Sequence, residues 1–184
     1  MAVSLYSFDD YFALLERDSV LYEIAKYAYS FAISFDPEEF LSMDTYDLLD
    51  YTGCYVDEVL DAAVDEDEVR FVLMKTAELS DHIEYYYDRE SREDYIELSC
   101  NHTMYSLNSS DEWDAHYDNF YLSLVDTACD SFEDLTGVTC YLLGRSSRHV
   151  CVEDTFENAL NYEKLCDVAH DLECEVIEEF NSNI

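Results

Sequence analysis

The sequence predicts an α+β fold that is mostly helical and contains a small antiparallel sheet. Two patterns lead to this prediction: long segments with apolar residues at helical spacing, and short apolar segments next to turn residues. Of the 184 residues, 49% are hydrophobic and 15% are aromatic, which is typical of a folded chain rather than a disordered one. The chain is therefore expected to bury a core despite its charge.

Helical patterns dominate the first half of the sequence. Ser7 followed by Asp10 indicates a helix start, and Asp18 or Ser19 begins a second helix that runs to about residue 35. Residues 36–39 start a region of short helices, and the acids at 65–68 open a helix toward residue 79. We expect residues 84–88 to continue or follow that helix. At least one of their three tyrosines should be exposed, because successive helical residues point in different directions.

The second half predicts hairpins near 95–107 and 138–153, packed against long helices near 110–136 and 154–180. The first of these helices has an apolar stripe that we expect to face inward, formed by Trp113, Tyr117, Phe120, Leu124, Ala128 and Leu135. We expect residues 1–92 to form an acidic helical region and residues 93–184 an α+β region. The two form one compact body or two closely packed subdomains, because three Gly and one Pro leave little room for a flexible linker.

The charge is strongly acidic throughout the chain. There are 44 acidic and 9 basic residues, for a net charge of −35. Residues 1–92 hold 23 acidic and 6 basic side chains, and residues 93–184 hold 21 and 3, so the charge is not confined to a tail. This balance argues against binding nucleic acid or an anionic membrane directly. Residues 27–35, the most apolar stretch, are half as long as a membrane helix. The expected partner is basic.

Carboxylates recur every four residues on the predicted helices, where neighbouring side chains lie about 5–6 Å apart. On helix 154–180 they stand opposite an apolar stripe that comprises Tyr162, Leu165, Ala169, Leu172, Val176 and Phe180. The carboxylates of this helix are Glu163, Asp167, Asp171, Glu175 and Glu179, and those of helix 110–136 are Asp114, Asp118, Asp126, Asp130 and Asp134. Their spacing is similar to that of phosphates along a nucleic-acid strand, so we expect these ten residues to bind the partner.

Few residue patterns in the sequence are typical of an active site, and we expect no enzyme activity, cofactor or metal. No lysine stands in a common nuclease arrangement, and isolated glycines exclude a phosphate-binding loop. The seven cysteines contain no C-x-x-C pair and predict reduced thiols of a cytoplasmic protein. Cys140 and Cys151, near His149, are expected to be buried thiols. Cys166 and His170 have a spacing that can hold zinc, and the sequence leaves this open, although a core cysteine beside a hydrogen-bonded histidine is favoured.

Arg145 and Arg148 form an isolated basic pair in the second half of the chain. They either form salt bridges with nearby carboxylates or contact an acidic site on a partner. The segment 139–155, with its Gly-Arg-Ser-Ser-Arg-His-Val core, resembles stretches of uncharacterised bacteriophage proteins. This resemblance implies a phage or mobile-element origin and no activity.

The carboxylate columns resemble, by surface chemistry, the DNA-mimic antirestriction and anti-CRISPR proteins of phages and plasmids. The resemblance implies an inhibitor that acts in the bacterial cytoplasm, where it occupies the groove of a basic DNA- or RNA-binding defence protein. That target is expected to be a restriction enzyme or a CRISPR effector. Two alternatives remain: a halophile-adapted ordinary protein, and an acidic adaptor for a basic nucleoid-type protein. The oligomeric state, including a homodimer, is open.

Overall fold

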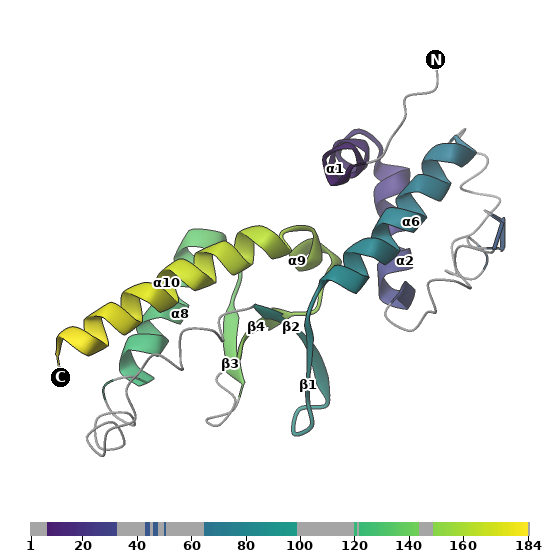
Figure 1. Cartoon of the computed structure of the whole chain (residues 1–184). Coiled ribbons are helices and arrows are strands. Elements are labelled where there is room, and N and C mark those ends of the chain that lie inside the picture. Colours follow the sequence, from purple (N-terminus) through teal and green to yellow (C-terminus); the bar gives the residue numbers. More distant parts are fainter. Residues whose placement is uncertain are drawn as a thin grey trace. The chain divides into compact units, whose positions relative to one another are not determined.

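A computed structural model describes residues 7–32, 43, 44, 46, 47, 50, 65–98, 120, 122–143 and 149–183. The chain divides into two compact units, Met1–His82 and Ile83–Ile184, which we call unit 1 and unit 2 and describe separately (Figure 1). The fold is mostly helical with a small four-stranded antiparallel sheet, which confirms the predicted α+β class.

Unit 1 contains three described helices: α1 (Phe8–Arg17), α2 (Ser19–Ala32) and α6 (Glu66–His82). Their starts follow the predicted caps. Ser7 and Asp10 form a capping box, and the Asp18 carboxylate accepts hydrogen bonds from the Val20 and Leu21 amides. The short helical region predicted between residues 36 and 64 lies almost entirely outside the described residues.

The core of unit 1 forms where α1 and α6 pack against α2. Burying these apolar faces supplies most of the helices' stability, since short helices are marginal in water. One polar contact lies inside this core: the Tyr11 hydroxyl is 2.8 Å from the Thr76 hydroxyl. The apolar side chains buried around it include Leu14, Leu15, Leu21, Ile24, Ala28, Val69, Val72 and Leu73.

Unit 2 contains a sheet with strand order β1-β2-β4-β3. Its strands are β1 (Tyr85–Asp88), β2 (Glu93–Leu98), β3 (Cys140–Leu143) and β4 (His149–Glu153). Neighbouring strands are antiparallel, so the sheet consists of two hairpins joined where β2 pairs with β4. The hairpin predicted near 138–153 is confirmed.

The two faces of this sheet differ in chemistry. Ile96, Leu98, Cys140 and Val152 share one face, where each is at most 8% exposed. We call it the inner face, since the Cys140 thiol lies 4.0 Å from the Cys129 carbonyl oxygen of helix α8 (Leu122–Thr136). Because side chains alternate along a strand, the residues next to these four in sequence project from the opposite face. We call this the outer face, and it carries tyrosines and carboxylates.

The C-terminal segment forms two helices, α9 (Phe156–Leu160) and α10 (Tyr162–Ser182), rather than one continuous helix. Thr155 caps α9 by accepting a hydrogen bond from the Asn158 amide. The break falls at Asn161, which ends α9 and stands at the start of α10. The apolar stripe begins at Tyr162, directly after the break, so the predicted pattern belongs to α10.

Two predictions at the start of unit 2 need correction. Residues 85–88 form strand β1 and not a helix, in keeping with the preference of tyrosine for strands. The strand predicted at the start of 95–107 is present as β2, but its hairpin partner is β1, which precedes it. Residues 103–107 lie outside the described residues. β1 pairs with β2, and the division between the two compact units falls after His82.

The expectation of an exposed phenol at 84–88 is confirmed, because Tyr87 is 54% exposed. The expected inward position of Leu135 on α8 is wrong, since this side chain is 66% exposed. Phe132, four residues after Ala128, is buried on that helix instead.

Candidate partner-binding surface

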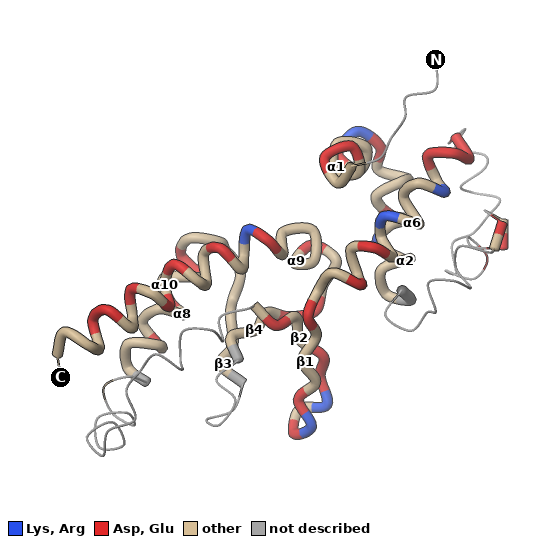
Figure 2. Tube along the Cα trace, viewed as in Figure 1, with Lys and Arg blue, Asp and Glu red and all other residues tan. Residues whose placement is uncertain are grey.

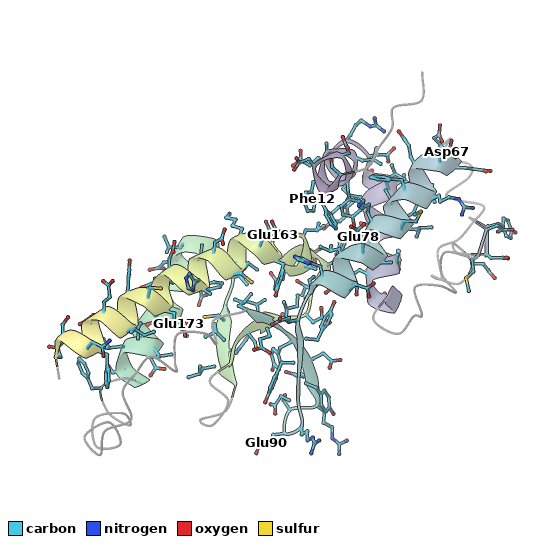
Figure 3. All side chains as sticks on the ribbon, viewed as in Figure 1. Phe12, Asp67, Glu78, Glu90, Glu163 and Glu173 are labelled. Atoms are coloured by element: carbon cyan, nitrogen blue, oxygen red, sulfur yellow. The ribbon has the colours of Figure 1, made fainter. Side chains whose placement is uncertain are left out.

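The carboxylate column of α10 lies on the solvent side of the helix. Glu163, Asp167, Asp171, Glu175 and Glu179 are all exposed. Of the predicted stripe opposite, all residues are buried except Leu172, which is half-buried, and Ile177 is buried beside them. Figure 2 shows acidic residues recurring along α10, and Figure 3 shows their side chains, with Glu163 near the start of the helix. The burial pattern therefore fixes which side of α10 presents its acids.

An apolar cluster between α8 and α10 holds this orientation. Val176, Ile177 and Phe180 are buried in it, and the α8-side residues packed against them are Phe120, Leu124, Val125 and Ala128. The Phe120 and Phe180 rings stack with their centroids 6.1 Å apart. Rotating α10 to hide its acids would expose this cluster and bury charge, and both changes are unfavourable.

The column of α8 is exposed in the same way. Asp126, Asp130 and Asp134 are exposed, whereas Phe132 on the other side of the helix is buried. Asp114 and Asp118 lie outside the described residues, as do Arg145 and Arg148. The structure thus places eight of the ten predicted carboxylates on the surface of α8 and α10, two helices that pack against each other in unit 2.

These columns are electrostatically unfavourable as they stand. Like charges four residues apart on a helix destabilise it by roughly 0.2–0.5 kcal/mol per pair. Neither α8 nor α10 has a basic residue in its last turn, where the negative end of the helix dipole favours a cation. Glu175 and Glu179 stand near that end of α10. A cationic partner would relieve the repulsion between neighbouring carboxylates. It would also offset the unfavourable interaction of acids with the negative end of the helix dipole.

Two basic side chains of unit 1, those of Arg17 and Lys75, pair with carboxylates of the same unit. The Arg17 guanidinium lies 2.8 Å from a Glu68 carboxylate oxygen, and this pairing raises the pKa of Arg17. Lys75 pairs with Glu78 and lies 4.9 Å from the centre of the Phe8 ring. In α10, Lys164 is the one lysine or arginine in the sequence of the helix. Helices α8 and α10 of unit 2 therefore carry far more acidic than basic side chains.

The cysteine and histidine pair of α10 is arranged differently from the predicted zinc spacing. The His170 ring nitrogen Nε2 lies 3.8 Å from the sulfur of Cys174, which is one turn after His170, whereas the predicted Cys166 is one turn before it. Cys166 and Cys174 are half-buried free thiols. Within the described residues, no group of three or more histidine, cysteine, aspartate or glutamate side chains has an arrangement that would hold a metal ion.

The thiols of the sheet occupy opposite faces. Cys151 is fully buried, and burial together with the Glu97 charge raises its pKa to about 12, so it is protonated at neutral pH. Cys140 on the inner face hydrogen-bonds the half-buried Cys129, which lowers the pKa of Cys129. The prediction that Cys140 and Cys151 are buried free thiols is confirmed.

One surface site was not predicted. Glu93, Tyr95, Tyr141 and Glu153 line a depression of about 400 Å³ on the outer face of the sheet. These residues come from β2 and from the β3–β4 hairpin, which is distant from β2 in sequence, so strand register brings them together. The one signal in the sequence is the alternation of tyrosine with carboxylate, as in Glu93-Asp94-Tyr95.

None of the helices within the described part of the chain is long and apolar enough to cross a bilayer. No family model, curated protein or solved structure matches this chain.

Proposed function

We propose that this protein is a DNA-mimic inhibitor that occupies the nucleic-acid-binding groove of a bacterial defence protein. The observation that supports it most is the exposed carboxylate columns of α8 and α10, which one apolar cluster holds facing outward. A restriction enzyme or a CRISPR effector, acting in the host cytoplasm, is the kind of target that presents such a groove.

The physical basis is competition for basic side chains. A groove that binds nucleic acid presents lysines and arginines at the spacing of phosphates. Five carboxylates at four-residue intervals span about 24 Å of α10, given a rise of about 1.5 Å per residue. Such a column can engage several basic side chains at once, and the net charge of −35 steers the encounter from a distance. Inhibition needs no catalytic step, so we propose that the protein is not an enzyme.

Reversing charges on the α10 column tests this proposal. A variant with Asp167→Lys, Asp171→Lys and Glu175→Lys should lose more than about tenfold in affinity for the target, because lysines would repel a basic groove. The matched control makes the same charge change on exposed acids of unit 1: Glu16→Lys, Glu23→Lys and Asp81→Lys. It should retain most of the binding. Circular dichroism checks that both variants remain folded.

The target is identified by capture from a bacterial lysate on the immobilised protein, with elution by duplex DNA. A mimic should hold nucleic-acid-binding proteins that the duplex displaces and that are lost at high salt. Captured proteins that duplex DNA fails to displace would contradict mimicry and favour an adaptor that binds its partner elsewhere. Equal capture by the α10 variant and the unit 1 control would contradict the role of the column.

A further inference from the structure

We propose that the depression on the outer face of the sheet binds the guanidinium group of an arginine side chain from a protein partner. The four residues that line it, Glu93, Tyr95, Tyr141 and Glu153, we call the tyrosine–glutamate site. This site belongs to the sheet of unit 2 and contains none of the column carboxylates. The inference therefore goes beyond the proposed function and does not depend on it.

Strand register assembles the site. Tyr95 of β2 stands directly opposite Glu153 of β4, and directly opposed residues project from the same face. Glu93 is two residues before Tyr95 and projects from that face as well. Tyr141 of β3 stands opposite Cys151, which is two residues before Glu153. Three adjacent strands thus contribute two rings and two carboxylates to one patch.

The two rings provide an aromatic surface. Their centroids lie 5.7 Å apart with an angle of 56° between the planes. Tyr95 is 8% exposed, whereas Tyr141 is 42% exposed and offers its ring to a ligand. The buried Cys151 thiol opposite Tyr141 is protonated, so it adds no charge there. A planar cation can stack on a tyrosine ring and gain cation–π attraction.

The carboxylates provide the charge. Glu93 and Glu153 are both exposed, and the Tyr95 hydroxyl donates a 2.6 Å hydrogen bond to Oε2 of Glu93. This bond raises the pKa of Tyr95 and holds the Glu93 carboxylate beside the ring. A carboxylate has about four lone-pair positions, so one such bond leaves Glu93 able to accept others.

Guanidinium fits these features better than other cations. Its flat face matches an exposed aromatic ring, and its edge carries five donors that suit two carboxylates. An ammonium group is a compact point charge without that planar match. Two carboxylates line the site, and the described residues contain no group of three or more histidine, cysteine, aspartate or glutamate side chains arranged to hold a metal ion. Because the whole chain is acidic, a basic protein partner would bring arginine to this face.

Nuclear magnetic resonance titration of the whole protein tests the assignment. The probe is the capped peptide acetyl-Gly-Arg-Gly-amide, and its citrulline counterpart is a neutral control of the same shape. The arginine peptide should produce saturable shifts in the ring signals of Tyr95 and Tyr141, and the citrulline peptide should produce none. Equal shifts with citrulline, or equal affinity for a lysine peptide, would overturn the assignment. Failure of the arginine peptide to bind would overturn it as well.

Matched variants separate the site from the general field of the protein. Tyr141→Ala and Glu153→Gln should each weaken binding about threefold to fivefold, and Tyr141→Phe should retain it because the ring remains. The controls are Tyr87→Ala, which removes an exposed tyrosine from β1, and Glu133→Gln, which neutralises an exposed glutamate of α8. Both controls should bind like the unaltered protein. Equal weakening by controls and site variants would show diffuse attraction and overturn the proposal.

Discussion

At the scale of single residues, the contact between Tyr11 and Thr76 shows how unit 1 accommodates polar groups in its core. Both side chains are 0% exposed, and the Thr76 hydroxyl also donates to the Val72 carbonyl oxygen at 2.8 Å. The Tyr11 hydroxyl is therefore the donor to Thr76, and burial raises the pKa of Tyr11. Loss of the Thr76 hydroxyl would leave the buried Tyr11 hydroxyl without its acceptor, whereas loss of the Tyr11 hydroxyl would leave Thr76 bonded to Val72.

Removal of the Thr76 hydroxyl and removal of the Tyr11 hydroxyl should destabilise unit 1 by different amounts. Thr76→Val leaves the Tyr11 hydroxyl buried without its acceptor, and we expect a loss of about 1–3 kcal/mol in the free energy of unfolding. Tyr11→Phe removes the donor and should cost about 0.5–1.5 kcal/mol. Urea denaturation measures both. The control Tyr27→Phe alters a tyrosine that is 52% exposed, so it should have no measurable effect. A larger loss for Tyr11→Phe than for Thr76→Val would contradict this donor assignment.

At the scale of elements, the rotation of α10 about its axis decides what the protein presents to solvent. The cluster with α8 sets that rotation, and Phe180 at 0% exposure is its most buried member. Leu135 on α8 has similar apolar character but is 66% exposed. The two side chains differ mainly in how much they are covered by neighbours.

Truncating these two side chains should therefore have unequal effects. Phe180→Ala should lower the free energy of unfolding of unit 2 by roughly 3–5 kcal/mol, because it removes buried apolar surface and leaves a cavity. Leu135→Ala should change it by less than about 0.5 kcal/mol, as expected for an exposed position. Chemical denaturation followed by circular dichroism compares the two variants. Similar losses would contradict the packing described for α8 and α10.

Sequence patterns predicted helices better than strand pairing. Ser7, Asp10 and Asp18 act locally, within a few residues, so their capping roles could be read directly from the sequence. The stripe from Tyr162 to Phe180 also follows from local spacing. Residues 85–88 could be read as a helix or a strand, and pairing with β2 decides the outcome.

The two candidate sites also differ in whether a local sequence pattern predicts them. The columns of α8 and α10 each lie on one helix, where periodicity places them opposite the apolar residues. The tyrosine–glutamate site depends on pairing between Tyr95 and Glu153, which are far apart in the sequence. No local pattern encodes that register, so this site could only be found in the fold.

At the scale of the whole molecule, the dominant property is self-repulsion. A net charge of −35 on 184 residues opposes compaction, and salt at 0.1 M largely screens repulsion between exposed charges that are more than about 10 Å apart. The apolar cores of the two units oppose this repulsion. Whether core packing outweighs charge repulsion without molar salt distinguishes an acidic inhibitor from a protein adapted to molar salt.

We expect the protein to be folded at low salt and to gain thermal stability as salt rises to physiological levels. The gain should become smaller above that range, since repulsion between charges more than about 8 Å apart is by then largely screened. Thermal melts by circular dichroism across a salt series measure this. Sodium chloride and sodium fluoride at equal ionic strength should have similar effects if screening is the cause. Loss of the fold without molar salt would favour the halophilic alternative.

The order of the strands has a consequence for self-association. In the described sheet, β1 and β3 are the outer strands, and each is four residues long. Short outer strands offer few backbone groups for another chain to extend the sheet, and charged residues at an edge discourage such pairing. β1 ends at Asp88, and the whole chain repels its own copies. Extension of this sheet is therefore a poor route to dimers or fibres, even in a chain so rich in tyrosine.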